Sequence, residues 1–393
     1  MKFIHLSDLH IGKRVNEFSM INDQKYILEQ ILNIIANEEI NAVIVSGDVY
    51  DKSIPAVEAV TVFDDFLTEL ATKDITTLII SGNHDSPERL GFGSKIMQNN
   101  GVHIYSVFDG ELHKVKIDDV NFYMLPFVKP IMVRRFYPEV ETYEDAVRTI
   151  IENTDIDKSQ KNVILSHQFI TKTGAETMRS DSESVSVGGL DNIDISVFDD
   201  FDYTALGHIH KAQRVSGREN VRYAGSPIPM SFAEKHYHHG VVMVTLDEGC
   251  AVDIRRIECP QSIPLISVPG GEAASPEKII EILRDLPEVD GEAPYLEVKV
   301  LLEEPEPMLR QEIEEALAGK KYRLARIVSA YRQEERVEKE ADGWKKGLQE
   351  MSPLQIAQSA FEKVYQTEMP ADLTDLFQEA YISATRKEEE EGE

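Results

Sequence analysis

Five short apolar runs each lead directly into a polar loop, and this repeat limits the possible folds more than any other feature of the sequence. The runs are rich in β-branched residues, and longer amphipathic stretches separate the first three of them. The five runs are Lys2–Leu6, Ala42–Ser46, Thr77–Ser81, Val163–Ser166 and Tyr203–Leu206. Strands that alternate with helices predict an α/β protein with layered sheets. The loops at the carboxyl ends of the strands should then meet along one edge.

The polar loops carry side chains that suit a metal centre. The candidates share carboxylate, amide or imidazole groups and are Asp8, His10, Asp48, Asn83, His84, His167, His208 and His210. Such a donor set favours Mn²⁺, Fe²⁺ or Zn²⁺ over calcium or a thiolate-bound metal. Side chains two residues apart point the same way from an extended strand end, so Asp8 and His10 form one pair and His208 and His210 another. This many ligands at one edge predicts two ions, the usual arrangement for phosphoester hydrolysis.

The order of the loops resembles the calcineurin-like metallophosphoesterases. The motifs that carry the resemblance are DLH at 8–10, GDVYD at 47–51, GNHD at 82–85, SHQ at 166–168 and GHIH at 207–210. Longer segments, IHLSDLHIGKR, SDSESVSVGGLDNI, FDYTALGHIHKAQ and AGSPIPMSF, are similar to bacterial SbcD, the nuclease subunit that works with the SMC-like ATPase SbcC. SbcD is the counterpart of the archaeal and eukaryotic double-strand-break repair nuclease. The similarity is dense over residues 1–235 and loose beyond them.

The resemblance implies a fold and a set of ligands. The fold is a layered β-sandwich flanked by helices, with a small α+β capping domain and partner-binding helices at the C-terminus. One metal takes Asp8, His10, Asp48 and His210, and the second takes Asp48, Asn83, His167 and His208, with Asp48 as the bridge. The expected cofactors are two Mn²⁺ ions, with Fe²⁺, Zn²⁺ and Mg²⁺ as alternatives. His84 corresponds to a catalytic histidine that does not bind metal.

Asp51 is a departure from the archaeal and eukaryotic relatives, which tend to carry a histidine in this loop. Phosphatases of the superfamily carry an aspartate there, bonded to the histidine of the GNHD motif. We therefore expect Asp51 and His84 to form a catalytic pair in which the carboxylate raises the pKa of the imidazole.

Changes in composition and residue pattern along the chain predict five segments. Residues 1–259 form the metallophosphoesterase domain and 260–332 the capping, DNA-binding domain. A linker at 333–352 leads to amphipathic helices at 353–385, and the acidic tail at 386–393 is expected to be disordered.

The expected activity is hydrolysis of DNA phosphodiesters in repair and recombination. By resemblance it includes an ATP-stimulated 3′→5′ exonuclease on duplex ends and an endonuclease on single strands or hairpins. The chain has no G-x-x-x-x-G-K-[ST] motif, so no nucleotide is expected to bind it. Two alternatives remain open at this point. One is a phosphatase or small-molecule phosphodiesterase on the same core, and the other is a scaffold for the ATPase.

Charge limits how DNA would bind. The formal net charge of −29 divides into −15 over residues 1–259 and −14 over the rest, so no general attraction draws the chain to a polyanion. Local contacts are expected from Lys13 and Arg14 beside the first loop and from Arg89. By resemblance, helices near 57–73 and 86–99 form a homodimer, and the last helices dock on an SbcC-like ATPase.

Several classes of protein are disfavoured. Two cysteines are too few for a disulfide framework, and no apolar stretch is long enough to span a membrane. The first residues lack the apolar core of a signal peptide, so a cytoplasmic location is expected. The HYHH run at 236–239 is expected to be a solvated loop rather than a metal site.

Overall fold

The computed structural model describes residues 1–171, 191–246 and 252–331, together with a few single positions between 354 and 374. The chain divides into two compact units. One is Met1–Leu301 with Glu306–Ser329, and the other is Leu302–Pro305 with Ala330–Glu393. The expected linker, C-terminal helices and acidic tail lie outside the described residues, apart from those single positions. The predicted segment boundaries stay predictions.

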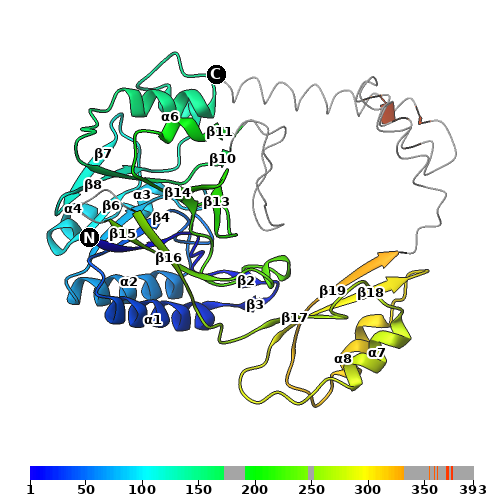
Figure 1. The fold of residues 1–393 in the computed structure, drawn as a ribbon. Coiled ribbons are helices and arrows are strands. Elements are labelled where there is room, and N and C mark those ends of the chain that lie inside the picture. Colours follow the sequence, from blue (N-terminus) through cyan, green and yellow to red (C-terminus); the bar gives the residue numbers. More distant parts are fainter. Residues whose placement is uncertain are drawn as a thin grey trace. The chain divides into compact units, whose positions relative to one another are not determined.

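The first unit contains two six-stranded sheets within the described ranges (Figure 1). The first sheet runs in the order β16-β15-β1-β4-β5-β6. Its strands are β1 (Lys2–Leu6), β4 (Ala42–Ser46), β5 (Thr76–Ile80), β6 (Val102–Tyr105), β15 (Gly240–Leu246) and β16 (Val252–Glu258). Strands β1, β4, β5 and β6 are parallel, whereas β15 and β16 form an antiparallel hairpin beside β1.

The second sheet runs in the order β13-β14-β12-β9-β8-β7. Its strands are β7 (His113–Ile117), β8 (Val120–Leu125), β9 (Lys161–Ser166), β12 (Tyr203–Leu206), β13 (Gln213–Val215) and β14 (Arg218–Tyr223). The four central strands are parallel, and both edge strands are antiparallel. Shorter strands complete the two-stranded ladders: β2 (Arg14–Val15), β3 (Phe18–Ser19), β10 (Ile170–Thr171) and β11 (Ile193–Asp194).

The sheets pack face to face as a sandwich, which confirms the expected fold. Along β1, Phe3 faces the second sheet and meets Phe122 with ring centroids 5.4 Å apart. Its neighbours Ile4 and Leu6 join the core under the helices on the other face. Both faces of this strand are therefore apolar, as expected of a central strand covered on both sides.

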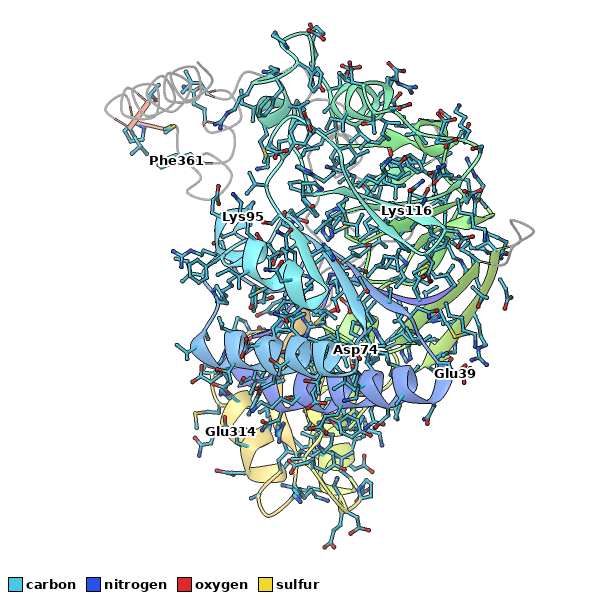
Figure 2. All side chains as sticks on the ribbon, turned by 90° about the vertical axis from the view of Figure 1, so that its left-hand side faces the viewer. Glu39, Asp74, Lys95, Lys116, Glu314 and Phe361 are labelled. Carbon is cyan, nitrogen blue, oxygen red and sulfur yellow. The ribbon has the colours of Figure 1, made fainter. Side chains whose placement is uncertain are left out.

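Helices cover the outer faces of the two sheets. α1 (Ile21–Glu38) and α2 (Val57–Thr72) lie on the first sheet, and α6 (Tyr143–Glu152) lies on the second. Glu39 and Asp74, labelled in Figure 2, follow α1 and α2 with φ of 53° and 56°, a left-handed conformation common where helices end. The remaining short helices are α3 (Pro87–Leu90), α4 (Ser94–Met97), η1 (Gln98–Asn100), α5 (Pro130–Val133), η3 (Ile195–Phe198) and η4 (Phe232–Glu234).

A small α+β module follows the sandwich. It consists of β17 (Leu265–Val268), α7 (Pro276–Arg284), β18 (Tyr295–Leu302), α8 (Leu309–Ala316) and β19 (Arg323–Tyr331), with strand order β17-β18-β19. Leu265, Tyr295 and Ala325 belong to the same apolar cluster as the core under α1 and α2. The described helices include none that is both long and apolar enough to cross a bilayer.

We expect His5 to make the stability of the sandwich depend on pH. The side chain is fully buried, its Nδ1 lies 3.0 Å from the Tyr203 hydroxyl, and burial lowers the pKa of the imidazole to about 3. Below pH 6.5 the unfolded chain binds a proton that the folded chain rejects, so this group lowers the free energy of unfolding as pH falls from 6.5 towards 3. Between pH 7 and pH 5 the loss should be about 2 kcal/mol. Urea unfolding of the metal-free wild type and of His5→Gln at both pH values should show this loss. The free energy of unfolding should fall by about 2 kcal/mol more in the wild type than in the variant. An equal fall in the two proteins would contradict the prediction.

Candidate metal centre

The loops at the strand ends bring the expected ligands together. Asp8 and His10 follow β1, and Asp48 follows β4, while Asn83 lies beyond β5. His167 follows β9, and His208 and His210 follow β12. All of these side chains are buried except Asn83, which is partly exposed, as is His84. Ligands from both sheets thus meet at one edge of the sandwich.

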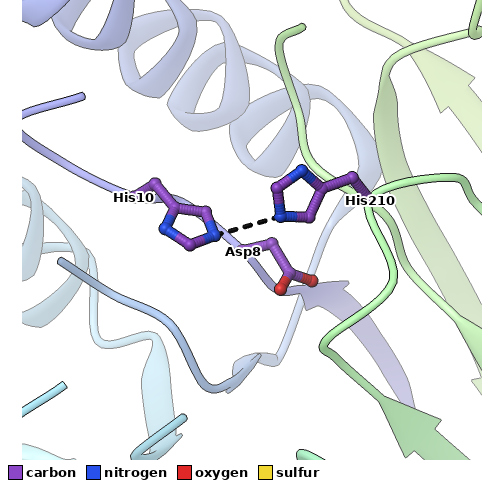
Figure 3. Close-up of side chains that lie close together, drawn as sticks. All are labelled: Asp8, His10 and His210. Carbon is purple, nitrogen blue, oxygen red and sulfur yellow. Dashed lines mark hydrogen bonds between the residues drawn. The ribbon is translucent and has the colours of Figure 1, made fainter. Parts of the chain in front are cut away.

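Asp8, His10 and His210 form one group of possible ligands (Figure 3). The Nε2 atoms of His10 and His210 lie 3.1 Å apart. One ligand atom from each of the three residues lies within 4.8 Å of the others. The carboxylate of Asp8 also accepts the backbone N–H of His208 at 3.0 Å, so the first and last loops of the centre are tied together.

Asp48 lies between this group and a second group of expected ligands, which consists of Asn83, His167 and His208. Its Oδ2 is 3.6 Å from His10 Nε2 and 3.2 Å from His167 Nε2. Two further candidate groups share this carboxylate: one with His10 and His84, the other with Asp8 and His167. Asp48 is therefore placed to serve two ions, as the resemblance implies.

Asn83 completes the second group. Its Oδ1 is 3.1 Å from His167 Nε2 and 3.0 Å from His208 Nδ1. The other nitrogen of His167, Nδ1, donates to the carbonyl oxygen of Ser46 at 2.7 Å. This bond places the hydrogen on Nδ1, which leaves Nε2 to bind a metal.

The donor set fits divalent cations. Burial holds the pKa of His10 well below its ordinary value, so the ring is neutral and has a lone pair to offer. Among the described residues, its Nδ1 has no hydrogen-bond partner. Carboxylates, neutral imidazoles and one amide oxygen that converge in a buried edge suit Mn²⁺, Fe²⁺ or Zn²⁺.

Charge pairing inside the centre is strong. Although burial opposes ionisation, His167 and His10 hold the pKa of Asp48 well below its usual range. The His167 imidazole is buried too, yet the carboxylate of Asp48 raises its pKa to about 9. In the metal-free chain its Nε2 therefore carries a proton at neutral pH, which a bound cation would displace. A carboxylate that stays ionised at this depth can bind a cation.

The backbone of the loops is strained at four of the expected ligands. Asp8, His10, Asp48 and His208 have φ of 52°, 43°, 51° and 94°, although none is glycine. Backbone bonds from Asp8 to Gly47 and from His10 to Asp48, at 3.1 and 3.0 Å, hold two of the loops against each other. Strain of this kind persists where the surroundings dictate it, and it clusters at functional sites.

Two glycines of the motifs are required by close approach. A Cβ on Gly47 would lie 2.4 Å from His167 Nδ1, and one on Gly207 would lie 2.0 Å from the Ser46 carbonyl oxygen. Larger residues would push His167 out of place, which explains glycine before Asp48 and before His208.

Comparison of the sequence with protein-family models agrees with this geometry. The model of the calcineurin-like phosphoesterases matches residues 1–212, more than half of the chain. The chain belongs to this family. A second model, the SbcD C-terminal domain (described as the type 5 capsule protein repressor C-terminal domain), matches residues 260–365. The chain is therefore an SbcD-like phosphoesterase with a candidate dimetal site.

Three solved structures are similar to the phosphoesterase at low identity. An archaeal phosphodiesterase shares 13% identity over 65% of this chain and 100% of its own, with a TM-score of 0.30. A dimetal phosphatase from Danio rerio shares 12% over 66% and 96%, and a protein from Thermus thermophilus shares 11% over 65% and 98%, both with a TM-score of 0.39. Family membership rests on the match over residues 1–212 and not on these structures.

His84 lies beside the expected ligands of the phosphoesterase, but it does not contact the Asp51 carboxylate. Its Nδ1 is 3.1 Å from the backbone carbonyl oxygen of Asp51, and its ring meets that of His10 edge to face at 4.8 Å. The Asp51 carboxylate instead pairs with Lys13 at 2.9 Å. The expected carboxylate–imidazole pair is therefore wrong, because a cation in the first loop takes the carboxylate and the main chain supports His84.

The expected DNA-binding residues differ in their surroundings. Lys13 is half-buried in its ion pair with Asp51. Arg14 is exposed and donates to the carbonyl oxygen of Glu17, and Arg89 is exposed on α3. Their contact with DNA stays a prediction.

Three supporting residues of the phosphoesterase were missed from sequence. Asp85 accepts the backbone N–H groups of Val49, Tyr50 and Gly82, and burial together with the charge of Asp48 raises its pKa to about 6. Its place in the GNHD motif was a usable signal. No such signal marks the other two residues, Gln24 and Glu234, because each lies outside the loops that contain the expected ligands.

The HYHH run also differs from expectation at its last residue. His236 and His238 are exposed, but His239 is buried, with Nδ1 3.0 Å from the Ser226 carbonyl oxygen and Nε2 3.1 Å from that of Glu234. The run is therefore solvated only in part, and His239 supports the turn that contains Glu234.

Proposed function

We propose that this phosphoesterase is the nuclease subunit of an SbcC–SbcD-like complex and hydrolyses DNA phosphodiesters at a two-metal centre. The observation that carries the proposal is the presence on one chain of the candidate dimetal site and of a match to the SbcD C-terminal domain. A phosphatase acting alone would need no such domain. ATP-stimulated 3′→5′ exonuclease and hairpin endonuclease activities, with Mn²⁺ as the metal, are part of the same proposal.

The chain's own residues divide the work at the centre. Asp8, His10 and His210 would hold one cation, and Asn83, His167 and His208 the other, with Asp48 shared between them. Bound divalent cations would polarise the phosphoryl group and lower the pKa of the attacking water. A phosphodiester would approach from the partly exposed side, where Asn83 and His84 lie.

His84 is placed to act as the general acid. Its Nδ1–H donates to the carbonyl oxygen of Asp51, so Nε2 is the nitrogen left to face the substrate. From there a protonated ring would stabilise developing charge or give its proton to the leaving oxygen. Lys13 would add positive charge beside the first loop, although its pairing with Asp51 limits its reach.

The proposal includes two protein partners. Ile54, Val57, Phe92 and Ile96 are large apolar residues with exposures of 68%, 79%, 82% and 73%. They lie in and around α2, α3 and α4, the helices expected to form a homodimer. The SbcC-like ATPase would bind through residues 353–385, which are almost entirely outside the described part of the chain.

One assay tests the function against its alternatives. The purified chain would be incubated with Mn²⁺ and one of three substrates: a linear duplex, a DNA hairpin or p-nitrophenyl phosphate. Light scattering on the same sample would report whether the chain is dimeric. Cleavage of both DNAs, abolished by a chelator, is the expected result. Hydrolysis of the monoester alone would establish a phosphatase. If no substrate is cleaved even with the SbcC-like ATPase and ATP present, the scaffold alternative holds.

A further inference from the structure

A buried glutamate supports the metal centre from behind. Glu234, the last residue of η4, has no exposed surface, and its Oε1 lies 3.0 Å from His210 Nδ1. Its other oxygen, Oε2, accepts the backbone N–H of Met230 at 2.8 Å. The hydroxyl of Ser231 is 3.4 Å from Oε1. This carboxylate thus has a donor at each oxygen.

The contact determines which nitrogen of His210 can bind a metal. An ionised carboxylate only accepts hydrogen bonds, so the hydrogen of the imidazole lies on Nδ1 and Nε2 keeps its lone pair. That Nε2 is the atom 3.1 Å from His10 Nε2. A carboxylate behind a ligand histidine fixes the ring and increases its basicity.

The α+β module contacts residues on either side of Glu234 along the chain. Glu297 of β18 is buried and accepts the Ser267 hydroxyl at 2.6 Å and Arg326 Nε at 2.5 Å. The Arg326 guanidinium lies 5.2 Å from the centre of the Phe232 ring, and Lys235 bonds to Ser267. Phe232 lies two residues before Glu234, and Lys235 lies one residue after it. The module therefore contacts this turn on both sides of Glu234.

A second connection joins the module to the loop of His10. The hydroxyl of Tyr295 in β18 donates to Asp23 of α1 at 2.9 Å. The next residue, Gln24, donates to the carbonyl oxygen of His10 at 2.7 Å and accepts the N–H of Gly12 at 2.9 Å. Both histidines of one metal group therefore have supports that reach the same module.

We propose that Glu234 is a positioning residue for His210 and that the α+β module, residues 265–331, holds the His10–His210 half of the metal centre in place. The inference rests on the proposed function, because it concerns the same metal centre. It assigns the module a role in metal binding in addition to any contact with DNA.

Glu234→Gln tests the positioning role. An amide offers one acceptor and one donor, so it can satisfy the N–H of Met230 or that of His210, but not both. Titration of the full chain with Mn²⁺ by calorimetry should show one ion bound about 10–100-fold more weakly and the other unchanged. Glu258→Gln is the matched control, because Glu258 pairs with His238 on the surface, with exposures of 67% and 74%, and should bind both ions as the wild type does.

Arg326→Met tests the module. It removes the contacts with Glu297 and Phe232 while leaving Glu234 in the chain, and the same ion should weaken by about two- to thirtyfold. Arg310→Met, which removes an exposed ion pair on α8, should change neither ion. Glu234→Asp, which keeps an acceptor-only group, should recover part of the affinity, and it carries the test if Glu234→Gln does not fold.

The outcomes separate the inference from the function on which it rests. A wild type that binds fewer than two Mn²⁺ ions contradicts the proposed function. A wild type that binds two, with Glu234→Gln indistinguishable from it, overturns the positioning role and leaves the function standing. Equal weakening of both ions in Arg326→Met would also overturn the inference, because the module would then support the whole centre rather than one half.

Discussion

Replacing His84 with glutamine is expected to lower the turnover of DNA cleavage by about 10²–10⁴-fold while two metal ions stay bound. Glutamine can still donate to the carbonyl oxygen of Asp51, the partner of His84 Nδ1 at 3.1 Å. It cannot deliver a proton to a leaving oxygen. The backbone N–H of residue 84 donates to Asp48 Oδ1 at 2.8 Å and does not depend on the side chain, so the ligand loop should keep its shape.

Metal content distinguishes this role from a competing one. His84 also belongs to a possible ligand group with His10 and Asp48. If it binds metal, the variant should lose an ion along with its activity. Single-turnover cleavage and elemental analysis of the same preparation decide between the two roles, with His113→Gln as the control. His113 of β7 pairs with Asp109, outside the centre, and its replacement should change neither quantity.

The acidity of the chain affects how cleavage should be measured. A net charge of −29 opposes DNA binding at a distance, so the affinity of this chain alone should come from local contacts and fall with salt. Low turnover of this chain alone, without the proposed ATPase partner, would therefore reflect weak binding as much as slow chemistry. Single-turnover conditions with excess enzyme separate the two.

Most of the metal centre could be predicted from sequence because its ligands follow strands. A strand end and a motif together place Asp8, Asp48 and His167 without reference to distant residues. The partner of Asp51 could not be predicted in this way, because it depends on how Lys13 reaches across from another loop. The same reason applies to Glu234, which lies in a short 3-10 helix and contacts His210, 24 residues earlier in the chain.

The two sheets were predictable for a similar reason, and the burial of polar residues was not. Continuous apolar strands such as β4 require cover on both faces, which a sandwich with outer helices supplies. His239 follows two exposed histidines in the same run, yet it is buried against two carbonyl oxygens. Only the path of the turn between β14 and β15 distinguishes it from its neighbours.

Replacing Asp48 with asparagine is expected to abolish binding of both ions, and with it all cleavage. The carboxylate lies near both groups, at 3.6 Å from His10 and 3.2 Å from His167. Loss of a supporting residue behind a ligand costs about 10–100-fold in metal affinity, so loss of a shared ligand should cost more at each site. Turnover should fall by more than about 10³-fold, since the reaction depends on the bound cations.

The fold should survive this change, which makes the result interpretable. Asparagine keeps an oxygen that can accept the N–H of residue 84, now bonded to Asp48 Oδ1. Asp51→Asn is the matched control, because it removes the same charge from the same loop, three residues away, where the carboxylate pairs with Lys13. Calorimetry with Mn²⁺ should show two ions for Asp51→Asn and none for Asp48→Asn. Retention of one ion by Asp48→Asn would mean that the carboxylate serves a single site, and the bridged centre would have to be given up.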